Sequence, residues 1–282
     1  MASHEITLVH PSGPADPRAV SMMSAMGHYF ASDRPLFLAG YGELCRVDLS
    51  GGRAMEICGG LGELAGALAG VFPAAEVVGL DLYEARTPKT EELRKRLPGL
   101  SYVAGNTFDL SSHPAESFDL VFGQAALHHL AHDLPGLCRS VLRVLKPGGR
   151  LVFIFEPLGH NLLVAAVRAA RMARRELPDE SNLFCSQFAS IVRAGFSRGE
   201  VQVFNLCGYP MKALSDRFEG LSRAVHKLDG WLRRFPRLMR FCGERRHLHQ
   251  VRPDPGRRSG FRDRGRGVQS RKLSLSRTPR MM

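Results

Sequence analysis

The stretch Ala54-Met55-Glu56-Ile57-Cys58-Gly59-Gly60-Leu61-Gly62 is the most informative part of this 282-residue sequence. A short apolar run ends in a glycine-rich turn, and an alanine-rich apolar segment with helical spacing begins at residue 63. Glycines in such a turn let the backbone pass close to a ligand, because no Cβ stands in the way. The pattern therefore predicts a strand, a ligand-binding turn and a helix, in that order.

Further short apolar runs follow this turn, separated by longer amphipathic stretches. We expect strands at residues 54–58, 76–80, 101–104, 118–122 and 150–155. Strands that alternate with helices indicate right-handed crossovers and a mostly parallel sheet with helices on both faces. The predicted fold class is α/β, a doubly wound and Rossmann-like sheet.

The composition changes along the chain and predicts its organisation. We expect a flexible N-terminus at 1–17, a helical lid at 18–50, the sheet domain at 51–240 with a helical insert at 158–182, and an Arg-rich low-complexity tail at 245–282. A tail so poor in aliphatic and aromatic residues cannot build a core, so we expect it to be disordered.

The formal net charge of +12 is concentrated at one end of the sequence. Residues 231–282 carry a net charge of +13, whereas residues 1–230 carry −1. A nucleic acid or an anionic membrane surface is therefore a possible partner only through the tail. The N-terminal residues lack a basic cluster followed by an apolar core, which favours a cytoplasmic location.

The six cysteines are far apart in the sequence, and no pair has the two-residue spacing typical of zinc or redox sites. We expect free thiols and no metal.

A carboxylate lies where a nucleoside would need one. Asp81 follows the predicted second strand, nineteen residues after Gly62. A carboxylate at this position is suited to accept hydrogen bonds from two ribose hydroxyls. Glu56 would place a negative charge at the mouth of the turn, which opposes phosphates and favours an ammonium or a sulfonium. Gly60, Gly62 and Ala65 also fit the loose dinucleotide fingerprint, so a nicotinamide-dependent oxidoreductase stays open.

Several more segments follow in a fixed order: Gly105-Asn106-Thr107 with Asp109, then residues 118–121, 127–130 and 146–149. Together with the glycine-rich turn and Asp81, they resemble the motifs of class I S-adenosylmethionine-dependent methyltransferases. The resemblance runs from about residue 54 to residue 206, and is closest to the small-molecule and quinone-biosynthesis branch. The sequence departs from the family at Cys58, where glycine is usual, and at Asn106, where aspartate is frequent. Residues 247–251 are only a weak candidate for the family's last strand.

The resemblance implies an enzyme that binds S-adenosyl-L-methionine. The cofactor-binding residues that it implies are Glu56, Cys58, Gly60, Leu61, Gly62, Asp81, Leu82, Asn106, Thr107, Asp109 and Gln124. His128 and His129 are the candidate catalytic residues, because imidazole titrates near neutral pH and could serve as a general base. The two histidines could equally be the packed start of a helix.

The methyl acceptor is expected to be a small molecule or lipid-like. The sequence after Phe122 lacks the polar-Pro-Pro-aromatic motif of amino-directed DNA methyltransferases, and no cysteine follows a proline. Tyr29, Phe30, Phe37 and Tyr41 could form an apolar wall for the acceptor, although core packing also explains them. The alternative function is a non-catalytic cofactor-binding protein that docks on nucleic acid or an anionic membrane through its basic tail.

Overall fold

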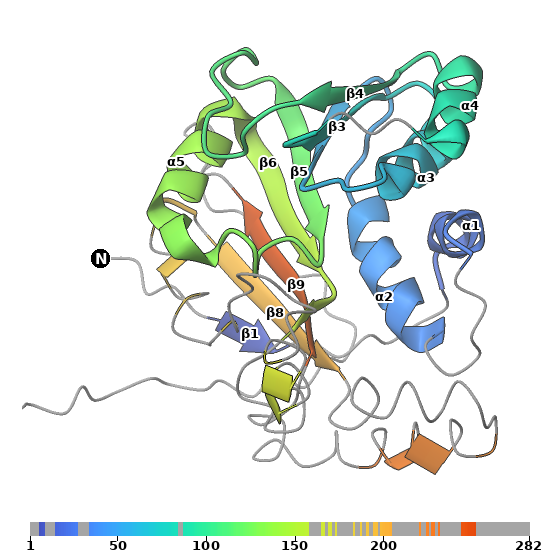
Figure 1. Ribbon diagram of the computed structural model, residues 1–282, viewed down its shortest axis with the longest axis vertical. Coiled ribbons are helices and arrows are strands. Elements are labelled where there is room, and N and C mark those ends of the chain that lie inside the picture. Colours follow the sequence, from blue (N-terminus) through green and yellow to red (C-terminus); the bar gives the residue numbers. More distant parts are fainter. Residues whose placement is uncertain are drawn as a thin grey trace, which may run out of the picture.

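The computed structural model describes five long stretches of the chain and a set of short ones. The long stretches are residues 15–27, 34–83, 87–157, 198–204 and 244–251. The short ones are residues 6–8, 165–166, 169–170, 173, 183, 187, 190–191, 194–196, 220, 224–225, 227–228 and 231. Within them, one sheet has the strand order β1-β8-β9-β6-β5-β2-β3-β4, and β7 pairs with β9. Figure 1 shows this sheet running through the middle of the molecule.

Five neighbouring strands of the sheet are parallel. They are β2 (Arg53–Ile57), β3 (Glu76–Asp81), β4 (Leu100–Ala104), β5 (Phe118–Gln124) and β6 (Leu145–Ile154). Each overlaps a strand predicted from the sequence, which confirms the doubly wound α/β class. β6 begins earlier than expected, and the register between β5 and β6 shifts between Phe118 and Leu120.

The helices begin at signals that are visible in the sequence. They are α1 (Pro17–Ala25), α2 (Arg34–Cys45), α3 (Glu63–Val71), α4 (Pro88–Arg96) and α5 (Leu134–Val144), with a short 3-10 turn η1 (Ala131–Asp133) before α5. Asp16, Thr87 and Asp133 cap α1, α4 and α5, each accepting a hydrogen bond from a backbone N–H of the first turn. In each of these three helices a proline stands in the first turn, where its missing N–H costs nothing.

Helices cover both faces of the parallel strands. α5 lies on one face, and α1, α2, α3 and α4 lie on the other (Figure 1). Side chains alternate accordingly along β2, since Met55 and Ile57 pack in the cluster with α5 whereas Ala54 packs in the cluster with α1, α2 and α3. Among the described residues, no helix is both long and apolar enough to cross a bilayer.

β9 (Glu244–Val251) corrects the expected start of the tail. It pairs antiparallel with β6 on one side and with β8 (Arg198–Phe204) on the other. Its sequence, ERRHLHQV, has only two aliphatic residues, so hydrophobic alternation does not reveal it. Backbone hydrogen bonds to two partner strands define the strand instead. The family's last strand is thus present, while residues 252–282 lie outside the described residues.

The N-terminus also contributes to the sheet. β1 (Ile6–Leu8) pairs parallel with β8, although residues 1–17 were expected to be flexible. Three residues carry too little pattern to be recognised as a strand without their partner. β7 (Glu156–Pro157) extends the antiparallel pairing with β9. Most of the expected insert at 158–182 lies outside the described residues.

Truncations test the role of β9. A chain ending at residue 243 should lose several kcal/mol of unfolding free energy relative to a chain ending at residue 251, because hydrogen bonds to both β6 and β8 are lost at about 1 kcal/mol each. Urea denaturation measures the difference. The chain ending at residue 251 is the matched control, since it keeps every strand of the sheet. Equal unfolding free energies for the two truncations would contradict the placement of β9.

Candidate functional site

The glycine-rich turn after β2 is fastened to the carboxyl end of β3. The backbone N–H of Gly59 donates to the carbonyl oxygen of Leu80 at 3.0 Å, and that of Gly60 donates to Oδ2 of Asp81 at 2.8 Å. Within the turn, the N–H of Gly62 donates to the carbonyl oxygen of Gly59 at 2.7 Å. The turn and Asp81, which are about twenty residues apart in sequence, therefore form one rigid unit.

Two of these glycines have positive φ for different reasons. Gly60 has φ +52°, and a Cβ there would have no atom within 4 Å, so its backbone borders open space. Gly62 has φ +72°, and a Cβ there would lie 2.2 Å from the Tyr102 ring. The Tyr102 hydroxyl donates to the carbonyl oxygen of Gly62 at 2.8 Å. Gly60 is thus suited to a ligand, whereas Gly62 is required for packing.

Glu56 lies beneath the turn instead of at its mouth, where the sequence analysis expected it. The side chain is buried, and its Oε2 accepts a hydrogen bond from the backbone N–H of Ala65 at 2.9 Å, in the first turn of α3. Burial raises the pKa of Glu56 to about 8; the charge of Asp81 adds to the rise, and the hydrogen bond from Ala65 opposes it. Its negative charge at neutral pH therefore depends on a cation nearby.

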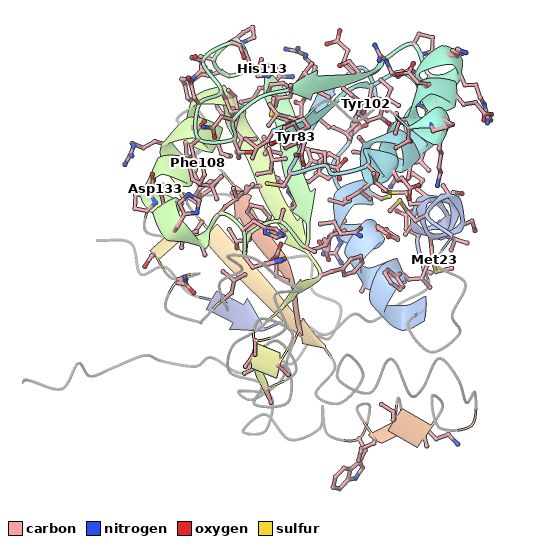
Figure 2. The ribbon with its side chains drawn as sticks, in the orientation of Figure 1. Met23, Tyr83, Tyr102, Phe108, His113 and Asp133 are labelled. Atoms are coloured by element: carbon pink, nitrogen blue, oxygen red, sulfur yellow. The ribbon has the colours of Figure 1, made fainter. Side chains whose placement is uncertain are left out.

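Asp81 and the turn border a narrow surface crevice that encloses no measurable cavity volume. Its lining residues are Gly59, Gly60, Gly62, Gly79, Leu80, Asp81, Tyr83 and Tyr102. Around it, the side chains of Leu61, Leu82 and Tyr83 are exposed by 63%, 66% and 82%. Figure 2 shows Tyr83 and Tyr102 beside β3 and β4. The two tyrosines were not predicted, because neither belongs to a motif and Tyr102 meets the turn only through the fold.

The loop after β4 holds Asn106 and Asp109. Oδ1 of Asn106 accepts from the backbone N–H of Phe108 at 2.9 Å, and Oδ1 of Asp109 accepts from that of Ser111 at 3.1 Å. The hydrogen bonds from Ser111 lower the pKa of Asp109. Both predicted adenine-framing side chains are exposed, and each has an oxygen bonded within its own loop. The structure does not place them on the glycine-rich turn.

Thr107, in contrast, reaches the turn. It is buried, and its side chain is hydrogen-bonded to the thiol of Cys58. Cys58 has φ +53°, a conformation that L side chains adopt rarely. Glycine, usual at this position in the family that the sequence resembles, would adopt it without strain. Burial raises the pKa of the Cys58 thiol to about 12, so the thiol stays protonated.

Gln124 ends β5 next to an aromatic cluster. Its Oε1 accepts from the Tyr41 hydroxyl at 3.5 Å. The ring of Phe155 packs edge-on against Phe37 and Tyr41, with centroids 4.9 and 5.6 Å apart. The expected apolar wall therefore has two of its four members at the carboxyl end of β5, while residues 29 and 30 lie outside the described residues.

The two candidate catalytic histidines differ in their surroundings. His128 is buried, and its Nδ1 lies 2.9 Å from Oε2 of Glu156. His129 is exposed, and its ring lies 4.1 Å from that of His128 between centroids. Glu156 is buried as well, and this contact makes it a partner of His128.

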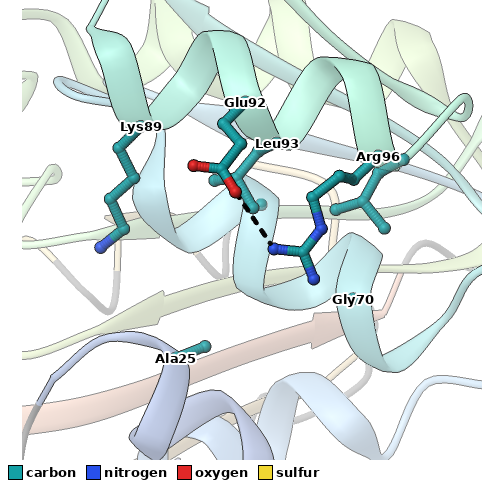
Figure 3. A pocket seen from close by; sticks show the side chains of 8 residues that line it. Ala25, Gly70, Lys89, Glu92, Leu93 and Arg96 are labelled. Atoms are coloured by element: carbon teal, nitrogen blue, oxygen red, sulfur yellow. Dashed lines mark hydrogen bonds and ion pairs between the residues drawn. The ribbon is translucent and has the colours of Figure 1, made fainter.

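A separate cavity lies between three helices. It measures about 470 Å³ and is lined by residues of α1, α3 and α4 (Figure 3): Ala25, Gly66, Gly70, Lys89, Glu92, Leu93, Arg96 and Leu97. Its charged groups pair within the protein, Lys89 with Glu63 at 2.9 Å and Arg96 with Glu92 at 3.5 Å. Since none of the predicted site residues lines it, volume alone does not identify the functional site.

The span from β2 to β6 matches a known family. A family model described as a methyltransferase domain covers residues 55–153. This part of the chain is therefore similar to a methyltransferase domain. The glycine-rich turn, Asp81, the loop after β4 and both histidines all fall within it.

Curated relatives of the methyltransferase domain come from several bacteria. The phthiotriol/phenolphthiotriol dimycocerosates methyltransferase of Mycobacterium leprae is 39% identical over 108 residues, which is 38% of this chain and 39% of that protein. Its counterpart in Mycobacterium tuberculosis is 38% identical over 124 residues, 44% of each chain. The trans-aconitate 2-methyltransferase of Deinococcus radiodurans is 31% identical over 150 residues, 53% of this chain and 52% of that protein. The matches thus span about half or less of these relatives.

Solved structures share the fold. One is phosphoethanolamine N-methyltransferase 2 of Haemonchus contortus, in complex with phosphomonomethylethanolamine and S-adenosylhomocysteine. Its TM-score is 0.55 at 18% sequence identity, and the match covers 83% of this chain and 61% of that chain. An S-adenosylmethionine-dependent methyltransferase from Mesorhizobium loti gives a TM-score of 0.51 at 20% sequence identity. The match covers 76% of this chain and 98% of that chain. The Rossmann-like fold of the methyltransferase domain is confirmed.

The raised pKa of Glu56 predicts a pH effect on stability. The pKa of about 8 means that the folded chain keeps a proton on this carboxyl up to about pH 8, whereas an unfolded carboxyl loses it near its ordinary pKa of 4.5. The stability contributed by this group is therefore complete below pH 4.5 and is lost as the pH rises toward 8. The amide oxygen of Glu56→Gln can still accept from Ala65, and this variant should not show the loss. Its unfolding free energy at pH 8 should exceed that of the parent by up to about 4 kcal/mol.

Urea denaturation at pH 5 and pH 8 measures the effect, with Glu92→Gln on the exposed side of α4 as the control that should follow the parent at both values. If Glu56→Gln and the parent lost the same stability between these values, the buried, protonated state of Glu56 would be excluded.

Proposed function

We propose that this protein is an S-adenosylmethionine-dependent methyltransferase that acts on a small-molecule or lipid-like acceptor. The observation that carries the proposal is the open space beside Gly60, with the Asp81 carboxylate bonded to the same backbone N–H. Two kinds of curated relative support a small acceptor, since they are named for phthiotriol dimycocerosates and for trans-aconitate.

The residues around the crevice fit an adenosyl group. A Cβ at Gly60 would enter open space, so a ligand can approach the backbone there. Asp81 is half-buried at the rim, where a carboxylate can accept hydrogen bonds from vicinal hydroxyls. Leu61, Leu82 and Tyr83 expose apolar surface next to it, which a flat heterocycle would cover.

Each residue has a role that follows from its position. Bound S-adenosylmethionine supplies an electrophilic methyl group for direct displacement, so the protein has to orient the reactants and exclude water. Asp81 would hold the ribose, and Glu56 would face the ammonium group, which would lower its pKa. Thr107 would lie beside the adenine and Gln124 beside the methionine portion. Cys58, Asn106 and Asp109 would add to the adenosine side.

The aromatic cluster supports an apolar acceptor. Phe37 and Tyr41 of α2 pack with Phe155 at the carboxyl end of β6, beside Gln124. A methyl acceptor that enters next to this cluster would meet a rigid apolar wall. An acceptor hydroxyl must lose its proton when it is methylated, and His128 or His129 would take it.

A second proposal concerns the tail. The net charge of +13 over residues 231–282 favours attachment to an anionic surface by counterion release. Such attachment would be compatible with either an active methyltransferase or a protein that only binds the cofactor. Transfer of a labelled methyl group separates these two cases.

Calorimetric titration tests the proposed function. The parent chain should bind S-adenosylmethionine and S-adenosylhomocysteine and should not bind NADH. Asp81→Asn keeps one oxygen for the N–H of Gly60 but loses a second acceptor for the ribose, so affinity should fall by about 1–3 kcal/mol. Asp48→Asn, which changes an exposed carboxylate outside the crevice, is the matched control.

Tight binding of NADH, or unchanged affinity for S-adenosylhomocysteine in Asp81→Asn, would contradict the proposal.

A further inference from the structure

The carboxylate of Glu156 lies at the centre of a buried network. Glu156 follows β6 and is 1% exposed. Its Oε1 accepts from the backbone N–H groups of Ala126 and Leu127 at 2.7 and 2.8 Å. Its Oε2 lies 3.3 Å from the backbone N of His128, which donates to it, and 2.9 Å from the Nδ1 of the same residue. One side chain thus binds three successive backbone donors and a histidine ring.

This arrangement selects the tautomer of His128. An ionised carboxylate can only accept hydrogen bonds, so the Nδ1 that faces it must carry a proton. In the neutral ring, Nε2 then holds the lone pair. The three backbone donors fix the carboxylate, so the ring orientation is fixed as well.

The backbone around the network is strained on both strands. Ala125 and Phe155, which are not glycines, have φ +48° and φ +62°. Ala125 lies directly before the backbone groups that donate to Glu156, and Phe155 lies directly before Glu156 itself. The N–H of Ala125 donates to the carbonyl oxygen of Ile154 at 2.9 Å. Such conformations cost about 1–3 kcal/mol each and persist only where surrounding contacts impose them. The network of Glu156 supplies those contacts.

The network lies at the same edge of the sheet as the glycine-rich turn. β2, β3, β5 and β6 are parallel, so their carboxyl ends lie at one edge of the sheet. The thiol of Cys58, in the glycine-rich turn, feels the charges of both Asp81 and Glu156, which add to the effect of burial on its pKa. Among the described residues, Asp81, Glu156 and Glu56 act by charge on Cys58, and the ring of His129 lies beside that of His128.

We propose that Glu156 is a positioning residue that holds His128 as the Nδ1–H tautomer and leaves Nε2 as the nitrogen that accepts a proton. The catalytic role of this arrangement rests on the proposed function. The proton of an acceptor hydroxyl passes to Nε2 of His128, and the O–H bonding pair stays on the oxygen as the nucleophilic pair. Glu156 stabilises the imidazolium that forms, since its carboxylate already binds Nδ1. His129, which is exposed, would not take this role.

The test is Glu156→Gln in the full chain. The amide oxygen of glutamine can accept from Ala126 and Leu127, while its NH₂ group can only donate toward Nδ1 of His128. The ring should therefore switch to the Nε2–H tautomer. Long-range ¹H–¹⁵N NMR spectra of histidine-labelled protein report the tautomer directly, and His128→Gln identifies the signals by their loss.

Three results are expected together for Glu156→Gln. The tautomer switches, the affinity for S-adenosylhomocysteine changes less than about 2-fold, and kcat falls about 100-fold or more at constant KM with phthiotriol dimycocerosates as the probe acceptor. Asp119→Asn is the matched control. Asp119 also joins β5 to its neighbours, through Arg53 N at 2.8 Å and Lys146 Nζ at 2.8 Å, but at the amino end of the strand. It should lower stability without changing the tautomer.

Two results would overturn the inference: a parent chain with the Nε2–H tautomer of His128, or a folded Glu156→Gln variant that keeps the parent tautomer. A loss of affinity for S-adenosylhomocysteine as large as in Asp81→Asn would also overturn it, because Glu156 would then belong to the cofactor site. Failure of the proposed function has a different signature, namely a parent chain that does not bind S-adenosylhomocysteine. The tautomer is measured without any ligand, so it decides the inference in that case too.

Discussion

The hydrogen bond from the backbone N–H of Gly60 to Asp81 is the constraint on which the candidate site depends. It joins the turn after β2 to the carboxyl end of β3, two parallel neighbours in the sheet. Because the carboxyl ends of parallel strands meet at one edge, this bond also sets the side of the sheet from which a ligand can approach. The left-handed conformation of Gly60 then leaves that approach open.

Three acidic residues at this edge have three different surroundings. Asp81 is half-buried at the rim, and one of its oxygens binds a backbone donor of the turn. Glu56 is buried beneath the turn, with a pKa raised to about 8. Glu156 is buried under the turn after β5 and binds four donors. The three carboxyl groups, although chemically alike, thus differ in burial and in hydrogen-bond partners.

Local sequence patterns predicted the parts of the fold that local interactions determine. The five parallel strands and α3 follow apolar periodicity, and the glycine-rich turn lies where the sequence indicated. β1 was missed, and β9 was recognised only as a weak candidate at residues 247–251. A three-residue strand and an arginine-rich and histidine-rich strand are defined by pairing with β8 and β6, which no local pattern contains. Tyr102 was missed for the same reason, since it meets Gly62 forty residues away in sequence. Glu56 was recognised as a site residue but placed at the mouth of the turn, because sequence spacing does not reveal burial.

A crystal structure with S-adenosylhomocysteine tests the central claim most directly. The account predicts the ligand beside Gly60, with its ribose hydroxyls on the Asp81 carboxylate and its adenine against Leu82. A ligand bound instead in the larger cavity between α1, α3 and α4, or a crevice at Gly60 that stays empty at saturating ligand, would contradict it.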